Sequence, residues 1–259
     1  MAKEIATTTK TTGTVAVVNQ KALDRLMDDS PSDSRDIMLP KILLAQGLSK
    51  SVAEGKAVMG EFRGSLDNKL LGNKEKGFEA IPFYISKSWI VFTEEKGTLK
   101  YTGQVPFGPE NANWTWDDVD AQGRKVRRDQ SLNMYCILPS EVTEGIFMPY
   151  LISFRRTSYT AGKKLITLKE KLKMFKRPLA STTITVTCRQ DKNDKGVFYV
   201  YDIAQCRPTT GEEIEAVGPW FDLVKLQAVK VDDSDLETET NVTAHAVHTH
   251  DDIDFSDKF

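Results

Sequence analysis

The residue types that could carry out catalytic chemistry are poorly placed for it in this sequence. All three histidines, His245, His248 and His250, lie in one segment near the C-terminus, so the central part of the chain has no histidine to act as a general base. Neither G-x-x-x-x-G-K-[ST] nor G-x-G-x-x-G occurs, which removes the usual phosphate-cradling loops. The histidine cluster itself is better explained as a polar spacer than as a metal site.

A cluster of carboxylates in a glycine- and proline-rich stretch is the remaining candidate for metal chemistry. Carboxylate oxygens bind Mg²⁺, so the cluster could serve a nuclease, but a solvated surface is the commoner use of such a loop. We therefore expect no enzyme, no cofactor and no metal site, with a magnesium nuclease as a minor alternative. The cluster consists of Glu110, Asp117, Asp118 and Asp120.

Charge is strongly segregated along the chain although the net charge is only −2. Residues 151–207 hold thirteen lysines and arginines against four acidic residues, whereas residues 231–259 hold nine acidic residues against one lysine. This asymmetry favours a basic surface for an anionic partner and an acidic interaction tail, the alternative being a solvated face with a solubilising tail. The expected phosphate contacts are Arg155, Arg156, Lys163, Lys164, Lys169, Lys171 and Lys173.

Aromatic residues are interleaved with these cations, as proteins that bind single-stranded nucleic acid require. Each base stacked on an aromatic ring contributes about 1–3 kcal/mol. Strand alternation predicts that Tyr199 and Tyr201 face outward while Phe198 and Val200 face the core. The W-T-W sequence at 114–116 is expected either to stack on bases or to clamp its loop to the core. The stacking candidates are Trp89, Trp114, Trp116, Tyr150, Tyr199 and Tyr201.

The elements that must position these residues are mostly strands. Composition and alternation predict strands at 78–86, 88–95, 132–139, 147–154, 181–189 and 196–206, with a turn at Lys87–Ser88 and a polar loop over 96–130. Helices are expected at 157–177 and, interrupted at Gly218–Pro219, at 212–230. The first helix should bury one row of residues, Ala161, Leu165, Leu168, Leu172 and Phe175.

This order of elements predicts a mainly β, α+β fold. The arrangement is compatible with an OB-fold-like five-stranded barrel that has a helix between its third and fourth strands. We expect three parts: a disordered N-terminal segment at 1–36, an OB-like nucleic-acid-binding domain at 37–230 and a disordered acidic tail at 231–259.

Cysteine usage and hydropathy indicate the cellular compartment in which the protein is expected. The three cysteines are far apart and lack C-x-x-C spacing, which argues against a disulfide framework and suits a reducing cytoplasm. We expect no membrane segment and no secretory signal, because no apolar run approaches the length that either requires.

The chain ends in HDDIDFSDKF, where acidic and large apolar residues alternate. Such a tail suits docking into a hydrophobic pocket with a basic rim, or onto the protein's own basic groove. Behind a basic, aromatic β-core, it resembles the partner-recruiting tip of single-stranded DNA-binding proteins from bacteriophages and bacteria. Ser256 and Lys258 interrupt the acids and no proline precedes the last phenylalanine, which puts the identity of the partner in doubt. The residues expected to bind a partner are Asp251, Asp252, Asp254, Phe255, Asp257 and Phe259.

Two inner stretches, 38–62 and 150–165 together with 193–203, are similar in texture to a phage replication-module family. The resemblance covers about residues 37–205 and implies a phage protein in the cytoplasm of an infected bacterium. Together with the basic and aromatic residues, the resemblance to single-stranded DNA-binding proteins implies a protein that coats single-stranded DNA in replication, recombination and repair, and recruits replication or recombination proteins through its tail. A strand-annealing recombinase and a phage structural protein are the alternatives. Homo-oligomer formation is left open, with residues 38–62 as a dimerisation arm or a lid.

Overall fold

A computed structural model of the chain describes residues 38–145, 147–194, 196–226 and 230–231. The expectations for residues 1–36 and for the acidic tail therefore lie outside the described residues, apart from the backbone of Val231. The helices and 3₁₀ turns (η) are α2 (Lys50–Ala53), η2 (Pro109–Asn111), α3 (Pro139–Glu144), η3 (Arg156–Ser158), α4 (Tyr159–Met174), η4 (Leu179–Ser181) and α5 (Gly211–Lys225). The strands are β1 (Met38–Leu39), β2 (Ile42–Leu44), β3 (Phe62–Gly64), β4 (Leu70–Gly72), β5 (Phe78–Glu95), β6 (Thr98–Pro106), β7 (Asp117–Val119), β8 (Lys125–Ile137), β9 (Tyr150–Arg155), β10 (Thr182–Asn193), β11 (Gly196–Pro208) and β12 (Lys230–Val231).

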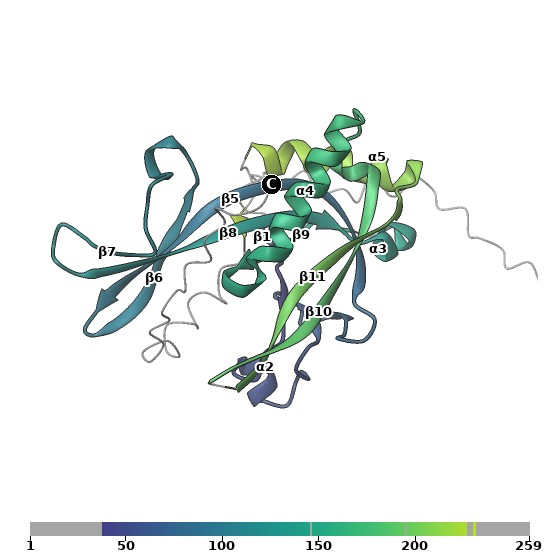
Figure 1. Cartoon of the computed structure of the whole chain (residues 1–259). Helices are drawn as coiled ribbons and strands as arrows, with labels where there is room; N and C mark the ends of the chain where they lie inside the picture. The colour runs from purple at the N-terminus through teal and green to yellow at the C-terminus, as the bar shows by residue number, and fades with distance from the viewer. Residues whose placement is uncertain (1–37, 146, 195, 227–229, 232–259) are drawn as a thin grey trace, which may run out of the picture. The chain divides into compact units, whose positions relative to one another are not determined.

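Two long antiparallel strands, β5 and β8, organise the main sheet of seven strands. They pair from Ile81 opposite Ile137 to Thr93 opposite Val126. The first residues of β5 also pair with β10 and its last residues with β6, while β8 pairs with β7 at its start and with β9 at its end. Figure 1 shows β6 and β7 beside the far end of β5 and β8, away from the β10–β11 hairpin.

The expectation of a mainly β, α+β protein is confirmed, but the sheet is not closed into a barrel. In the described residues, the edge strands β9 and β11, which would have to pair to close a barrel, have no ladder between them. The segment after β1 lies between these edges: Lys41 bridges to Leu151 of β9, and the side chain of Gln46 bonds to the backbone of Tyr199 of β11. A side-chain link therefore stands where a closed barrel would have a strand pair.

The expected turn at Lys87–Ser88 is wrong, because β5 runs through it without interruption. Lys87 lies opposite Leu132 and Ser88 opposite Ser131, in the middle of the β5–β8 ladder. The side chain of Ser88 accepts hydrogen bonds from Asn133 and Gln104, which satisfies its hydroxyl inside the sheet. The expected loop at 96–130 is likewise largely two further strands, β6 and β7, with the start of β8.

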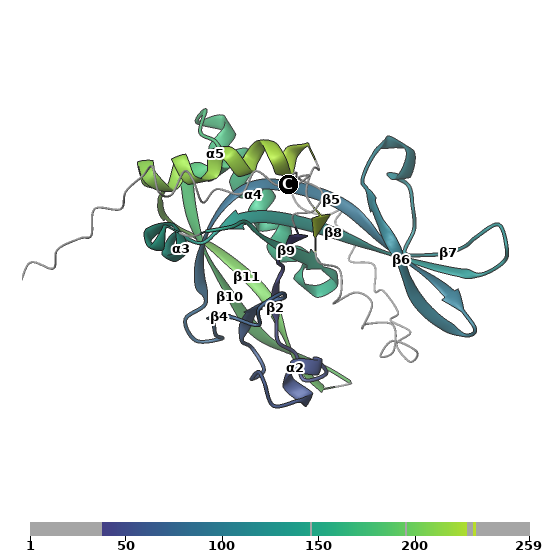
Figure 2. The same ribbon diagram turned by 180° about the vertical axis from the view of Figure 1, so that it is seen from behind.

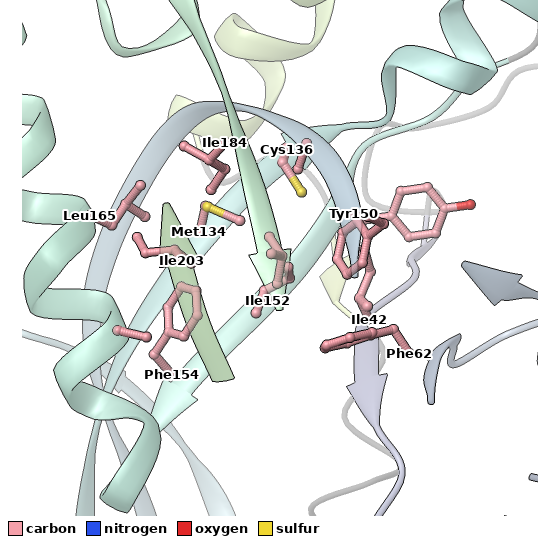
Figure 3. Close-up of a cluster of buried hydrophobic side chains, with 14 of the residues drawn as sticks. Ile42, Phe62, Met134, Cys136, Tyr150, Ile152, Phe154, Leu165, Ile184 and Ile203 are labelled. Atoms are coloured by element: carbon pink, nitrogen blue, oxygen red, sulfur yellow. The ribbon is translucent and has the colours of Figure 1, made fainter. Parts of the chain in front are cut away.

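The larger hydrophobic core lies between the sheet and α4 (Figure 3). It contains Met134, Ile152 and Phe154 from the sheet and Leu165 from the helix, each with an exposed fraction of at most 1%. The predicted periodic row is confirmed for Ala161, Leu165 and Leu172, which are buried, and for Leu168, which packs partly against the core. Phe175 departs from the row: the helix ends at Met174, and 68% of Phe175 is exposed.

Helix α5 covers the opposite face of the sheet, where Val217 and Val224 pack with Ile81 and Ile137 (Figure 2). The helix runs through Gly218–Pro219 without the expected interruption. Its N-terminus is held by Glu213, whose carboxylate accepts hydrogen bonds from the Thr210 amide (2.8 Å) and from the Arg207 guanidinium (2.7 and 3.0 Å). The hydrogen bond from Arg207 is the main reason why the pKa of Glu213 is lowered.

We expect Glu213→Gln to destabilise the fold by about 2 kcal/mol at neutral pH, since it removes a charged cap and leaves Arg207 without its close partner. The folded-state pKa lies below the ordinary value of 4.5, so the ionised carboxylate stabilises the fold above that pH. This contribution is lost as the pH falls through the folded-state pKa. Urea unfolding between pH 3 and 7 measures both effects. The exposed Glu215→Gln on the same helix is the control, and equal losses in the two variants would contradict the prediction.

Candidate nucleic-acid interface

Strand register places cationic and aromatic side chains on the face of the sheet that carries α4. Lys87 and Trp89 alternate along β5 and lie opposite Leu132 and Gln130 of β8. Leu132 packs directly under α4, because a Cβ on Gly162 would meet its side chain at 2.6 Å. Lys87 and Trp89 therefore share a face with the N-terminal half of α4.

Side-chain contacts and the pairing of Trp89 with Gln130 bring seven side chains together around Trp89. The Lys87 amine lies 3.7 Å from the Phe107 ring centre, and the guanidinium of Arg128 lies 4.5 Å from that of Trp114. Trp89 packs against both rings, at 6.2 Å from each. We call this set the cationic–aromatic surface; it comprises Lys87, Phe107, Trp114, Arg128, Gln130, Tyr159 and Lys163.

The first turns of α4 complete the cationic–aromatic surface. The Tyr159 hydroxyl bonds to the side chain of Gln130 at 3.0 Å, which ties the start of the helix to β8. The amine of Lys163 lies 5.7 Å from the Tyr159 ring centre. Burial lowers the pKa of Lys87. Lys163 is close enough for its positive charge to lower the pKa of Lys87 further.

Lys87 and Lys163 lack an acidic partner among the described residues, unlike most cations around them. Lys164 pairs with Asp202 at 2.6 Å, Arg128 with Asp118 at 2.6 Å and Arg156 with Asp129 at 2.8 Å. No ion pair within the described part of the chain includes Lys87 or Lys163. Two neighbouring ammonium groups held over aromatic rings without a counter-charge constitute a site suited to an anion.

The basic residues expected to contact phosphate are spread over a longer region than this site. Arg155 ends β9, and Arg156, which adopts a positive φ of 49°, is turned toward the buried Asp129. Farther along α4, Lys169, Lys171 and Lys173 are exposed, and Lys173 makes a long 3.9 Å contact with Glu170. Of the seven, Lys163 alone belongs to the cationic–aromatic surface.

Two of the six stacking candidates are core residues. Trp89 is 3% exposed and Tyr150 is 4% exposed, and the Tyr150 hydroxyl donates to Glu141 at 2.8 Å. A buried ring has no face to offer to a base, so we remove both from the interface. Trp89 instead packs against the half-buried rings of Phe107 and Trp114 and supports them.

The expected orientation of β11 is reversed at its tyrosines. Tyr199 and Tyr201 turn toward the main core, where Tyr201 packs against Phe62 and Phe154. The Tyr201 hydroxyl donates to the carbonyl oxygen of Ile42 at 2.7 Å, which lets the polar end of the ring sit inside. Val200, expected in the core, is buried on the other side of the strand at 1% exposure, so both faces of β11 are covered.

The W-T-W sequence clamps two adjacent arginines of β8. Trp114 contacts Arg128, and Trp116 lies 4.6 Å from Arg127 by ring centre. Because successive residues of a strand face opposite ways, the two tryptophans lie on opposite sides of the sheet. Trp116 is 39% exposed, and Trp114 is half-buried beside Trp89.

Two of the four carboxylates considered for magnesium pair with arginine side chains instead. Asp118 pairs with Arg128, and Asp120 accepts from both the backbone and the guanidinium of Arg124. The hydrogen bond from Arg128 lowers the pKa of Asp118, and the Arg124 backbone N–H is the main cause that lowers the pKa of Asp120. Over the described ranges, no three histidine, cysteine or acidic side chains gather as metal ligands. The three histidines lie outside these ranges.

Lys87, Phe107, Arg128, Gln130 and Tyr159 were not anticipated as site residues. Lys87 was assigned to a turn, which hid its alternation with Trp89 along one strand. If 78–95 is taken as one strand, residues 87, 89 and 91 fall on one face, and this pattern could have revealed part of the site.

The fold and this site define a mainly β protein with a partly exposed cationic–aromatic surface. Residues 9–225 match the family model described as Pam3 phage gp34-like protein, and the chain belongs to that family. No curated protein and no solved structure matches it. The expected phage origin is thereby supported at the level of the family. Within the described residues, no helix is both long enough and apolar enough to span a membrane.

Proposed function

We propose that this protein binds single-stranded DNA without sequence preference and that it does so through the cationic–aromatic surface. The observation that carries the proposal is the pair Lys87 and Lys163, two neighbouring amines without an acidic partner in the described chain, each over an aromatic ring. A phosphate between them would replace their mutual repulsion with attraction and release counterions from the DNA.

The rings beside these amines supply the second component of such a site. Trp114 and Tyr159 lie on the two sides of Trp89 and Gln130, so a strand crossing the surface would meet amines and aromatic faces together. Stacking tolerates any base because every base has a π-face, whereas phosphate contacts are independent of sequence. This combination favours single strands over duplex DNA, whose bases are already stacked on each other.

The order of strands supports an OB-type binding protein. Pairing runs β9–β8–β5–β10–β11, and α4 connects β9 to β10, as the helix between the third and fourth strands would in an OB fold. The residues between β5 and β8 and the turn between β10 and β11 then correspond to the two loops with which OB folds hold oligonucleotides. Phe107 and Trp114 belong to the first of these regions, and Lys87 of β5 lies beside it, with its amine 3.7 Å from the Phe107 ring centre.

The wider role that we propose is that of a phage protein in the host cytoplasm. It would coat exposed strands during replication, recombination or repair, without turnover and without a cofactor. The acidic segment at 251–259 would recruit replication or recombination proteins, since its apolar residues can be buried while its carboxylates orient the contact.

Replacing Trp114 tests this surface most selectively. We expect Trp114→Ala to weaken binding of labelled oligo-dT roughly tenfold, because a stacked base contributes about 1–3 kcal/mol. Trp116→Ala should have a much smaller effect, since Trp116 contacts Arg127 on the other face of β8. Fluorescence anisotropy gives both affinities, and thermal unfolding shows whether each variant is folded. Equal weakening by both variants would argue against the proposed surface.

A further inference from the structure

The C-terminal end of α4 exposes two large apolar side chains next to each other. Met174 is 83% exposed and Phe175 is 68% exposed. Phe175 is the C-cap residue, with φ −93° and ψ 14°, so its side chain leaves the buried row that Leu165 and Leu172 follow. Water-exposed methionine and phenylalanine side by side are costly unless something covers them.

Cations surround this apolar pair. Lys171, Lys173, Lys176 and Arg177 are all exposed. Within the described residues, their one ion pair joins Lys173 to Glu170 at 3.9 Å, and Arg177 donates a hydrogen bond to the carbonyl oxygen of Ser181. A ligand for this place must therefore combine apolar groups with negative charge.

We infer that the end of α4 is the docking site for residues 251–259 of the same chain. That segment carries Ile253, Phe255 and Phe259 among four aspartates, which complements an apolar pair rimmed by four cations. The burial of Phe255 or Phe259 against Met174 and Phe175 supplies the anchor, and the aspartates pair with the rim.

The length of the connecting segment allows this contact within one chain. Residues 232–250 separate the end of β12 from the docking segment and span up to about 60 Å when extended. A tethered segment has an effective concentration in the millimolar range, so it outcompetes the same segment of a second copy at ordinary protein concentrations.

This docking site is distinct from the cationic–aromatic surface. Lys163 and Met174 are eleven residues apart on one helix, which places them about 16 Å apart along its axis. An exposed apolar pair also has no role in holding phosphate. Docking of the segment can therefore be tested without DNA, and its failure would leave the DNA-binding proposal unaffected.

Photo-crosslinking in the full chain tests the contact. We would replace Phe175 with benzoylphenylalanine, irradiate, digest and identify the linked peptides by mass spectrometry. We expect the peptide that contains residues 251–259, and we expect its yield to fall several-fold when Lys173→Glu and Lys176→Glu are added. The same replacement at Ile166, which is 37% exposed on the same helix, should not capture that peptide. Charge reversal at Lys50, at the start of α2, and at Lys56, just after that helix, is the control for net charge.

Mixing ¹⁵N-labelled and unlabelled chains before irradiation identifies the source of the segment. Crosslinks in which both peptides carry the same label support docking within one chain. Mixed-label crosslinks at the statistical frequency would overturn that assignment, and so would crosslinks from position 175 that lack residues 251–259. Loss of yield in the Lys50 and Lys56 control as large as in the Lys173 and Lys176 variant would show that general charge attraction is responsible.

Discussion

Replacing Lys87 and Lys163 together by alanine is expected to weaken binding of oligo-dT about 100-fold at low salt. Each amine contributes one phosphate contact, and roughly 1.4 kcal/mol for each corresponds to a tenfold change. The variant should also show a salt dependence that is shallower by about 1.4 in log–log slope, since each contact with single-stranded DNA contributes about 0.7. Anisotropy titrations over a salt series measure both quantities.

The matched control for this variant is Lys50→Ala with Lys56→Ala. It removes the same charge from the start of α2 and from the turn after it, where Lys56 pairs with Glu54 at 2.7 Å, and it should change the affinity little. Thermal unfolding of the Lys87 and Lys163 variant should be unchanged or slightly improved, because two neighbouring positive charges are removed. If both variants lose affinity equally, only net charge matters, and the local site is refuted.

The largest effect on stability is expected at Gly162, where α4 approaches the sheet most closely. A Cβ at this position would meet Leu132 at 2.6 and 2.9 Å and Phe154 at 3.1 Å, all within a packed core. We expect Gly162→Ala to destabilise the fold by about 1–3 kcal/mol, although alanine favours helices over glycine by about 1 kcal/mol. Chemical denaturation measures the free energy of unfolding.

Gly211→Ala provides the contrasting control, because a Cβ at the start of α5 meets nothing within 4 Å. That variant should be as stable as the wild type or slightly more stable. Gly162→Ala should also weaken DNA binding more than its stability loss explains, since moving α4 shifts Lys163 away from Lys87. A Gly162→Ala protein as stable as the wild type would contradict the packing described for α4.

Local patterns predicted the elements that a periodic row of buried residues determines. The helix over 157–177 was found because Ala161, Leu165 and Leu172 recur at helical spacing, and each is buried. The hairpin of β10 and β11 was found from alternation and from the turn residues between its strands. Both signals are contained within a dozen neighbouring residues.

Features that depend on distant contacts were not predictable from such patterns. Alternation along β11 separates Tyr199 and Tyr201 from Val200, but it does not tell which face meets the core. The orientation is fixed by the hydrogen bond from Tyr201 to Ile42, far away in the sequence. Likewise, the polar Ser88 indicates a turn in the sequence. In the structure, its hydroxyl accepts hydrogen bonds from Asn133 and Gln104 and therefore fits within the sheet.

The candidate site also depends on contacts between residues that are distant in the sequence. Lys87 and Lys163 become neighbours only because Gly162 lets α4 pack against Leu132 and because Tyr159 bonds to Gln130. The sequence indicated the basic character of 151–207 and the presence of aromatic rings among the cations, whereas the proximity of a strand lysine to a helix lysine required the tertiary structure.

One measurement tests the central claim most directly: anisotropy titration of the full chain with labelled oligo-dT and with matched duplex at increasing salt. The account predicts binding of oligo-dT that is tighter than binding of duplex, weakens steeply with salt and quenches tryptophan fluorescence through Trp114. Absence of oligo-dT binding at low salt, or duplex binding of equal strength, would contradict it.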